Sequence, residues 1–299
     1  MLIKCKPDFI DTGGRIVRYG KSPLLLVCCI TLCLLGLVIT VFGQKSSSLA
    51  RPLKFSKESE RLPLPFQRSE PDTPYLTKLR TEYGLSNIVA GKKSDYEKVR
   101  AISKWVRSQW EHNGSNMPQK PDALSILEEA KQGKQFRCVE YSIVLAAALN
   151  SVGIPARQLS ILTEDVETRE SGAAHVVAEA YLADMKKWIM VDGQWDVIPT
   201  LKGKPLGAVE FQHALAANAK GLGVDTFSGV QAKGYFEWVA PYLFYFITKF
   251  DNRYGVTANR KELVLVPIGA KEPKIVQKKW PIGDVVYTRS LPVFNAKPV

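Results

Sequence analysis

The sequence predicts a mixed α+β domain preceded by one transmembrane helix. Three features of the 299 residues carry this prediction. Residues 23–43 are apolar and uncharged, as a membrane span requires. The apolar run 138–152 has the composition of a buried helix, with a glycine and a proline shortly after it. Two short segments, 175–182 and 187–192, then have the residue types of two strands joined by a turn.

The apolar stretch 23–43 matches the ~20 residues that a helix needs to cross the hydrocarbon core. Basic residues outnumber acidic ones in the preceding segment, 1–22, which predicts a short cytoplasmic tail and a body outside the cytoplasm. A cleaved signal peptide that ends before Gln44 is the alternative. Because the apolar run is longer than the usual core of a signal peptide, the sequence favours an uncleaved anchor and a single-pass membrane protein.

The composition becomes polar after the predicted span. Residues 44–73 are polar and Pro-rich, show no helical or strand periodicity, and are interpreted as a linker. The folded core is expected over 74–220, followed by a C-terminal extension, 221–299. The aromatic segment 234–250 of this extension is interpreted as a wall of the core, with a lip of the substrate groove or a contact with the bilayer surface as alternatives.

Two further segments of the extension have strand composition. They are "ELVLVPIG" at 262–269 and "DVVYTRS" at 284–290, and they are expected to complete or extend the sheet. The sequence leaves open whether the extension forms a separate small domain.

Two helices are predicted ahead of the apolar run. Ser94 and Glu97 form a capping box followed by an apolar stripe, so a helix is expected over 94–111. Asp122 is suited to cap a second helix, and Gly133 is suited to end it.

The third helix is expected to start at Cys138 and to end before Gly153 and Pro155. Nearly every side of it is apolar, so it should be central and buried. In its first turn, unpaired backbone N–H groups and the helix dipole favour a thiolate at Cys138. The other cysteines are Cys5 and three within 23–43, so Cys138 has no disulfide partner in the body. A buried structural thiol is the alternative.

His175 leads the first strand of the predicted hairpin, and Asp192 closes the second. Antiparallel pairing around the turn at 183–186 places these two residues opposite each other, to within a residue or two. Cross-strand Cβ atoms lie ~4.5–5.5 Å apart, close enough for a carboxylate to hold an imidazole. Thiol catalysis requires a cysteine nucleophile, a histidine that moves its proton and an acid that orients the ring. Cys138, His175 and Asp192 are therefore the candidate catalytic residues.

The segment 136–195 resembles the transglutaminase-like superfamily and covers about a fifth of the chain. Members carry a cysteine at a helix start, a Gly-Ile-Pro-Ala-Arg segment, a strand led by a histidine, and an aspartate that closes the next strand. Here these are Cys138, residues 153–157, His175 and Asp192.

Two positions depart from the pattern of the superfamily. Val177 replaces the aromatic residue usually found two positions after the histidine, and Gly193 stands where proline is frequent. Neither change removes a reacting group, but both motivate an alternative in which the fold is kept without catalysis.

The resemblance implies a papain-like fold, in which the helix that carries the cysteine packs on an antiparallel sheet, and a triad of Cys138, His175 and Asp192. It also implies thioester chemistry on an amide bond of a peptide or protein substrate, without a cofactor. Water as the acceptor gives a peptidase or amidase, and an amine gives a cross-link. Hydrolysis is favoured because it needs no second binding site. The alternative is a catalytically silent binding or scaffold module at the membrane.

A papain-like site also needs donors for the oxyanion. The backbone N–H of Cys138, at a helix start, is one expected donor. Gln132, Gln135 and the indole of Trp110 are candidates for a second donor, and Gln194 is a candidate for the wall of the cleft. The sequence does not choose among them.

Four more polar residues are interpreted as structural. Arg157 and Glu179 are expected to pair and to support the core. His112 and His213 are interpreted as capping or surface histidines. No metal site is predicted, because the sequence contains neither a CxxC nor an HExxH motif.

The formal net charge of +12 raises the question of an anionic partner. The basic residues are spread along the chain and form no nucleic-acid-binding motif, so nucleic acid is not expected as a partner. Anionic lipid or an anionic cell-envelope polymer is the remaining possibility, and binding to either should weaken as salt is raised.

Overall fold

The computed structural model describes residues 48–61, 64–254 and 261–299. The predicted cytoplasmic tail, 1–22, and the predicted span, 23–43, lie outside these residues. Among the residues described, no helix is both long enough and apolar enough to cross a bilayer.

The helices begin where local capping signals predict them. Ser94 Oγ accepts the N–H of Glu97 at 3.2 Å, and Asp122 Oδ1 accepts the N–H of Ser125 at 3.1 Å, so both predicted N-caps are confirmed. The helices of the described residues are α1 (Pro74–Glu82), α2 (Leu85–Val89), α3 (Asp95–Arg107), α4 (Ala123–Lys131), α5 (Cys138–Ser151), α6 (Ala208–Ala216), α7 (Ala232–Val239), the 3-10 turn η1 (Ala240–Tyr242) and α8 (Leu291–Phe294).

Helix α3 ends at Arg107, four residues before the predicted end at Glu111. After Arg107 the backbone N–H of Gln109 binds the carbonyl of Val106, three residues back, at 3.1 Å, so the last turn tightens and the helix ends. The carbonyl of Trp110 then accepts the hydroxyl of Tyr141 at 2.6 Å and a guanidinium N–H of Arg107 at 3.2 Å. The chain turns there, and His112 then pairs with Phe136 in a short β-bridge.

A six-stranded sheet forms the centre of the described residues, in the order β13-β10-β8-β2-β3-β4. All neighbours are antiparallel except β10 and β13, which are parallel. The strands of the described part of the chain are β1 (Gln67–Arg68), β2 (Ala156–Leu162), β3 (Ala174–Leu182), β4 (Lys187–Val191), β5 (Ile198–Leu201), β6 (Lys204–Pro205), β7 (Leu222–Asp225), β8 (Tyr245–Lys249), β9 (Asp251–Asn252), β10 (Glu262–Leu265), β11 (Ile275–Val276), β12 (Trp280–Pro281) and β13 (Val285–Thr288).

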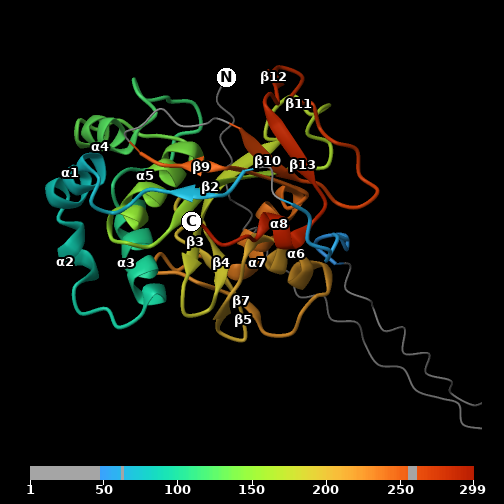
Figure 1. Cartoon of the computed structure of the whole chain (residues 1–299), viewed down its shortest axis with the longest axis horizontal. Coiled ribbons are helices and arrows are strands. Elements are labelled where there is room, and N and C mark those ends of the chain that lie inside the picture. The colour runs from blue at the N-terminus through green and yellow to red at the C-terminus, as the bar shows by residue number, and fades with distance from the viewer. Residues whose placement is uncertain (1–47, 62–63, 255–260) are drawn as a thin grey trace, which may run out of the picture. The chain divides into compact units, whose positions relative to one another are not determined.

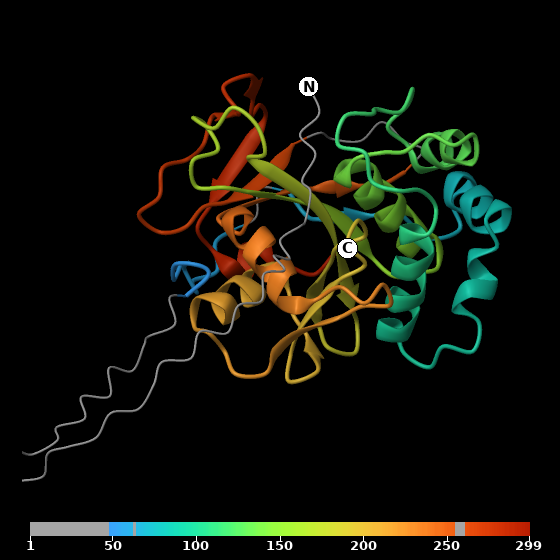
Figure 2. The ribbon, with the colours of Figure 1, turned by 180° about the vertical axis from the view of Figure 1, so that it is seen from behind.

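Alternation along the strands builds one core on each face of the sheet. Ala178, Ala180 and Leu182 of β3 pack into the core that contains α5, whereas Val177 packs into the core on the other face. In Figure 1, α5 lies between the sheet and the helices α1, α3 and α4. In Figure 2 the gold and orange helices α6 and α7 lie in front of the strands. The predicted packing of the α5 helix on an antiparallel sheet is therefore confirmed.

The C-terminal extension belongs to the same sheet. Strand β8 pairs with β2 in the middle of the sheet, and β10 and β13 follow outward from β8. The expectation that 262–269 and 284–290 contribute strands is confirmed. In the residues described, the boundary predicted at 220 therefore does not separate two independent cores.

Part of the predicted linker, 44–73, is folded into the body. Leu53, Phe55 and Phe66 are buried, and the ring of Phe66 stacks on Phe250 at a centroid distance of 5.3 Å. Strand β1 pairs with β9, far along the chain. The linker interpretation is wrong for these residues. Their apolar partners come from the last third of the sequence, so no local periodicity reveals them.

Candidate active site

Three separate elements bring the predicted catalytic residues together. Cys138 is the first residue of α5, His175 is the second residue of β3, and Asp192 directly follows β4. The ring nitrogen Nε2 of His175 lies 2.7 Å from Oδ2 of Asp192, and both side chains are almost fully buried. The observed pairing sets Ala178 opposite Val191, two residues from the predicted register and within its stated tolerance.

The carboxylate of Asp192 is fixed by four hydrogen-bond partners. Oδ2 faces His175 Nε2 and accepts the hydroxyl of Tyr235 at 2.9 Å. Oδ1 accepts the backbone N–H groups of Gln194 at 3.1 Å and Trp195 at 3.2 Å. Because the tight turn after β4 supplies two of these donors, the backbone itself orients the carboxylate.

His175 is placed to exchange a proton with Cys138. Its Nε2 is taken by Asp192, which leaves Nδ1 as the ring nitrogen for the thiol. Burial alone would lower the pKa of His175, but the charge of Asp192, the hydrogen bond to Asp192 and the hydrogen bond to Cys138 outweigh it and raise the pKa to about 10. The raised pKa favours the imidazolium form of the ring at neutral pH.

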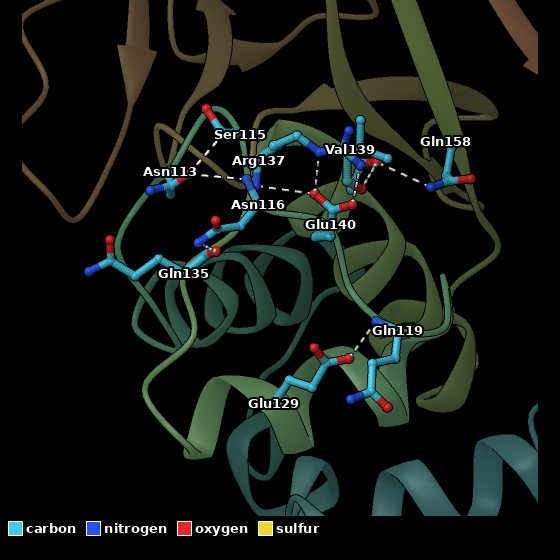
Figure 3. Close-up of polar contacts among 11 residues, drawn as sticks. Asn113, Ser115, Asn116, Gln119, Glu129, Gln135, Arg137, Val139, Glu140 and Gln158 are labelled. Carbon is cyan, nitrogen blue, oxygen red and sulfur yellow. Dashed lines mark hydrogen bonds and ion pairs between the residues drawn. The ribbon is translucent and has the colours of Figure 1, made fainter. Parts of the chain in front are cut away.

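Cys138 is partly exposed, as a reactive thiol must be. The first turn of its helix is held by Glu140, whose Oε2 accepts the backbone N–H of Arg137 at 3.1 Å and whose Oε1 lies 2.6 Å from the Arg137 guanidinium. Figure 3 shows this pair facing each other at the helix start. The backbone N–H of Cys138, in the first turn of α5, has no intrahelical acceptor and is free to meet an oxyanion.

Among the three predicted candidates for a second oxyanion donor, Trp110 has an indole N–H that no described residue accepts. Its indole Nε1 is buried and has no hydrogen-bond partner within the described residues. Its ring packs against Tyr141 at a centroid distance of 4.5 Å and against Phe136 at 5.7 Å, so it lies beside the turn that carries Cys138. A buried N–H group without a hydrogen-bond partner destabilises the fold, unless a bound molecule accepts its hydrogen bond.

The glutamine candidates are less well placed. The amide of Gln132 donates to Glu128 at 3.3 Å on α4. Gln135 is exposed, its carbonyl accepts the Asn116 amide, and its own side chain extends away from the helix start in Figure 3. Gln194 takes part through its backbone N–H, which binds Asp192. Neither Gln132 nor Gln135 is supported as an oxyanion donor.

Three aromatic residues at the site escaped the sequence prediction. Tyr235 binds Asp192, and the ring of Trp238 meets the His175 ring edge-on at a centroid distance of 4.8 Å. Tyr242 lies next, with its ring centroid 6.1 Å from that of His175. Burial raises the pKa of the Tyr242 hydroxyl, Arg169 opposes the rise, and the nearby charge of Cys138 adds to it. All three come from the aromatic segment 234–250, and the spacing of Tyr235 and Trp238 on one helix face is the signal that could have found them.

The two departures from the superfamily pattern have packing explanations. A Cβ atom on Gly193 would lie only 3.3 Å from Leu145 and 3.6 Å from Tyr141, so the turn after β4 packs closely on α5. Val177 is fully buried in the core on the face of α6 and α7.

The predicted pair of Arg157 and Glu179 is a buried support. Arg157 Nη2 lies 2.7 Å from Glu179 Oε2, and both residues are 1% exposed. The guanidinium also donates to the carbonyl of Phe294, and it lies against the rings of Phe66, Trp188 and Phe294. The pair joins β2, β3 and α8, on the same sheet face as His175.

The remaining histidine near the site is His112. It is exposed, and its pKa is lowered by burial of part of its ring and by the nearby charges of His175 and Arg107, against the effect of Asp192. His112 is therefore close enough to His175 for their charges to interact, which its interpretation as a capping or surface histidine did not indicate. Within the described ranges, no three His, Cys, Asp or Glu side chains are grouped as metal ligands would be.

The family model of the transglutaminase-like superfamily core matches residues 85–193. These residues contain the elements α2, α3, α4, α5, β2, β3 and β4, together with Cys138, His175 and Asp192. Residues 85–193 are therefore similar to the transglutaminase-like core, as the motifs within 136–195 predicted. A search of curated proteins gives no significant match.

Solved structures with partial similarity include a candidate cysteine protease from Cytophaga hutchinsonii, with 18% identity, a TM-score of 0.33, and coverage of 54% of this chain and 49% of that chain. LapG of Legionella pneumophila has 16% identity and a TM-score of 0.30, over 56% of this chain and 86% of that chain. Red sea bream transglutaminase has 16% identity and a TM-score of 0.30, with coverage of 40% of this chain and 26% of that chain. The chain thus spans about half the length of the Cytophaga hutchinsonii protein.

Proposed function

We propose that this protein is a cysteine-dependent enzyme that cleaves an amide bond of a peptide or protein through a thioester. The observation that carries the proposal is the 2.7 Å contact of His175 Nε2 with Asp192, because it leaves Nδ1 for Cys138. An imidazolium with a pKa raised to about 10 is suited to hold a thiolate beside it before the substrate arrives.

The reaction follows from these positions. The thiolate of Cys138 attacks the amide carbonyl carbon, and the carbonyl oxygen becomes an oxyanion that the Cys138 backbone N–H and the Trp110 indole stabilise. His175 gives its proton to the departing amine as the C–N bond breaks, which leaves a thioester and a neutral imidazole. His175 then takes a proton from water, the hydroxide oxygen attacks the thioester carbonyl, and the C–S bond breaks. The thiolate and imidazolium return, and a carboxylic acid is released.

An amine in place of water would give a cross-link by the same steps. We propose hydrolysis because it needs no second binding site for an acceptor. Thioester chemistry needs no cofactor, and the proton transfers above use side chains of the chain alone.

The test is the pH dependence of Cys138 alkylation by iodoacetamide, followed at the Cys138 peptide by mass spectrometry in the full chain. Because His175 keeps its proton up to about pH 10, we expect fast labelling near pH ~6, well below the ordinary thiol pKa of ~8.5. A His175→Ala variant should label at least ~10-fold more slowly near pH ~6. Equal and slow labelling of both proteins would contradict the proposal and favour a binding module without catalysis.

Trp110→Phe separates the oxyanion donor from the nucleophile. We expect it to lower the rate of acylation by p-nitrophenyl acetate by ~10²-fold, because the transition state loses one hydrogen-bond donor. Alkylation by iodoacetamide develops no oxyanion, so its rate should change little. Trp105→Phe, a matched change on α3, should leave both rates unchanged. A parallel loss of both rates in Trp110→Phe would show a packing role for the indole instead.

We also propose that the enzyme is anchored in a membrane by residues 23–43, with the catalytic body outside the cytoplasm. The support is the uncharged apolar sequence and the basic segment ahead of it. Extraction of the full chain from membranes by detergent, but not by alkaline carbonate, is the expected result. Release by carbonate would contradict the anchor.

A further inference from the structure

Helix α7 contributes a buried hydroxyl to the proposed catalytic group. Tyr235 Oη donates to Asp192 Oδ2 at 2.9 Å, across 43 residues of sequence. Burial and the charge of Asp192 raise the pKa of Tyr235 well above its usual value, so the hydroxyl keeps its proton and remains a donor.

The ring of Tyr235 cannot easily turn away from Asp192. It is 1% exposed and lies between Phe211, nearly parallel at a centroid distance of 6.5 Å, and Trp195, at 6.0 Å. The direction of its hydroxyl is therefore set by packing on α6 and on the turn after β4. A donor held in this way fixes the rotation of the carboxylate that it binds.

Tyr235 and His175 share the same carboxylate oxygen. The backbone N–H groups of Gln194 and Trp195 hold Oδ1, and Tyr235 adds a second donor to Oδ2 beside His175 Nε2. Without the hydroxyl of Tyr235, Oδ2 would lose one of its two side-chain partners, and the two backbone N–H groups on Oδ1 would have to limit the rotation of the carboxylate about its bond to Cβ with His175 alone. The contact between His175 Nε2 and Asp192 Oδ2 would then be less rigidly positioned.

We propose that Tyr235 is a positioning residue, which acts through Asp192 to keep His175 as an imidazolium beside Cys138. This inference rests on the proposed function and extends it to the C-terminal part of the chain. Tyr235 touches neither the thiol nor the substrate carbonyl in this scheme. Its removal should therefore change the pH dependence of the Cys138 alkylation rate, and this change should require Asp192.

The test compares Tyr235→Phe with Tyr245→Phe in the full chain. Both changes keep the ring of a buried tyrosine and remove one hydrogen bond of its hydroxyl, since Tyr245 Oη donates to the carbonyl of Lys271 at 2.9 Å, away from the proposed site. We expect Tyr235→Phe to lower the rate of Cys138 alkylation near pH ~6 by ~3–10-fold and to leave the limiting rate near pH ~11 unchanged. Tyr245→Phe should match the wild type at both pH values.

A double-variant cycle shows whether the effect passes through Asp192. Asp192→Asn should itself slow labelling near pH ~6, and adding Tyr235→Phe should then cost less than ~2-fold more, because the shared partner has already changed. If Tyr235→Phe lowered the alkylation rate by the same factor in the wild type and in Asp192→Asn, the positioning role would be overturned. So would a Tyr235→Phe variant that behaves like Tyr245→Phe.

The failure of this inference can be told from the failure of the proposed function. If wild-type labelling depends on His175 but not on Tyr235, the enzyme proposal stands and the positioning role falls. If wild-type labelling near pH ~6 is slow and independent of His175, both fall.

Discussion

Replacing Cys138 by Ser should lower the hydrolysis of p-nitrophenyl acetate by ~10³-fold or more, the largest functional effect expected of a single change. A serine hydroxyl is far less acidic than a thiol, so the imidazolium of His175 could no longer hold an ionised nucleophile beside it. The measurement is the initial burst of p-nitrophenol, which counts acylated sites.

The serine variant also has a clear control. Ser and Cys are similar in size, and Cys138 is partly exposed, so the denaturation midpoint of the variant should stay close to that of the wild type. A burst that survived in Cys138→Ser at the wild-type amplitude would remove Cys138 as the nucleophile. A lost burst together with a much lower midpoint would point to a folding defect.

Replacing Arg157 by Met should give the largest loss of stability, ~3–5 kcal/mol in the free energy of unfolding. The change leaves the carboxylate of Glu179, which is 1% exposed, without its guanidinium partner in the core. It also leaves the carbonyl of Phe294 without the two guanidinium donors at 3.1 Å. Urea denaturation followed by fluorescence would measure the difference, with the slope m checked for constancy.

Two further variants test this reading of the pair. Arg169→Met removes an arginine whose partner Asp165 is also exposed, and it should cost less than ~1 kcal/mol. Arg157→Met combined with Glu179→Leu should recover part of the loss, because no unpaired charge remains buried. A loss below ~1 kcal/mol in Arg157→Met alone would contradict a supporting role for the pair.

Local signals predicted the parts of the fold that short stretches of sequence determine. Ser94 and Asp122 cap their helices because a side-chain oxygen three positions ahead of a backbone N–H needs no tertiary partner. The hairpin brought His175 and Asp192 together because a short turn limits the possible registers. The sequence alone therefore predicts that these two side chains lie close together.

Local sequence signals did not predict the contacts between segments that lie far apart in the sequence. Tyr235 reaches Asp192 only because α7 packs on the sheet, and the sequence of 234–250 did not distinguish a core wall from the lip of a groove. Leu53 and Phe55 lie in a stretch whose prolines and charges are typical of a linker, and their burial depends on residues near the C-terminus. Trp110 could be named as a candidate donor from the sequence, but it differs from the glutamines only in its buried Nε1, which no residue in the described part of the chain accepts.

The position of β8 beside β2 has a consequence for the timing of synthesis. Cys138, His175 and Asp192 all leave the ribosome before β8, which spans Tyr245–Lys249. Until β8 emerges, β2 is an open sheet edge, and before α7 (Ala232–Val239) emerges the His175 side of the sheet lacks its aromatic cover. A nascent chain that ends near residue 220 therefore holds all three reacting groups without the framework that orients them. The thiol should become reactive only late in translation, when the whole body can close around it.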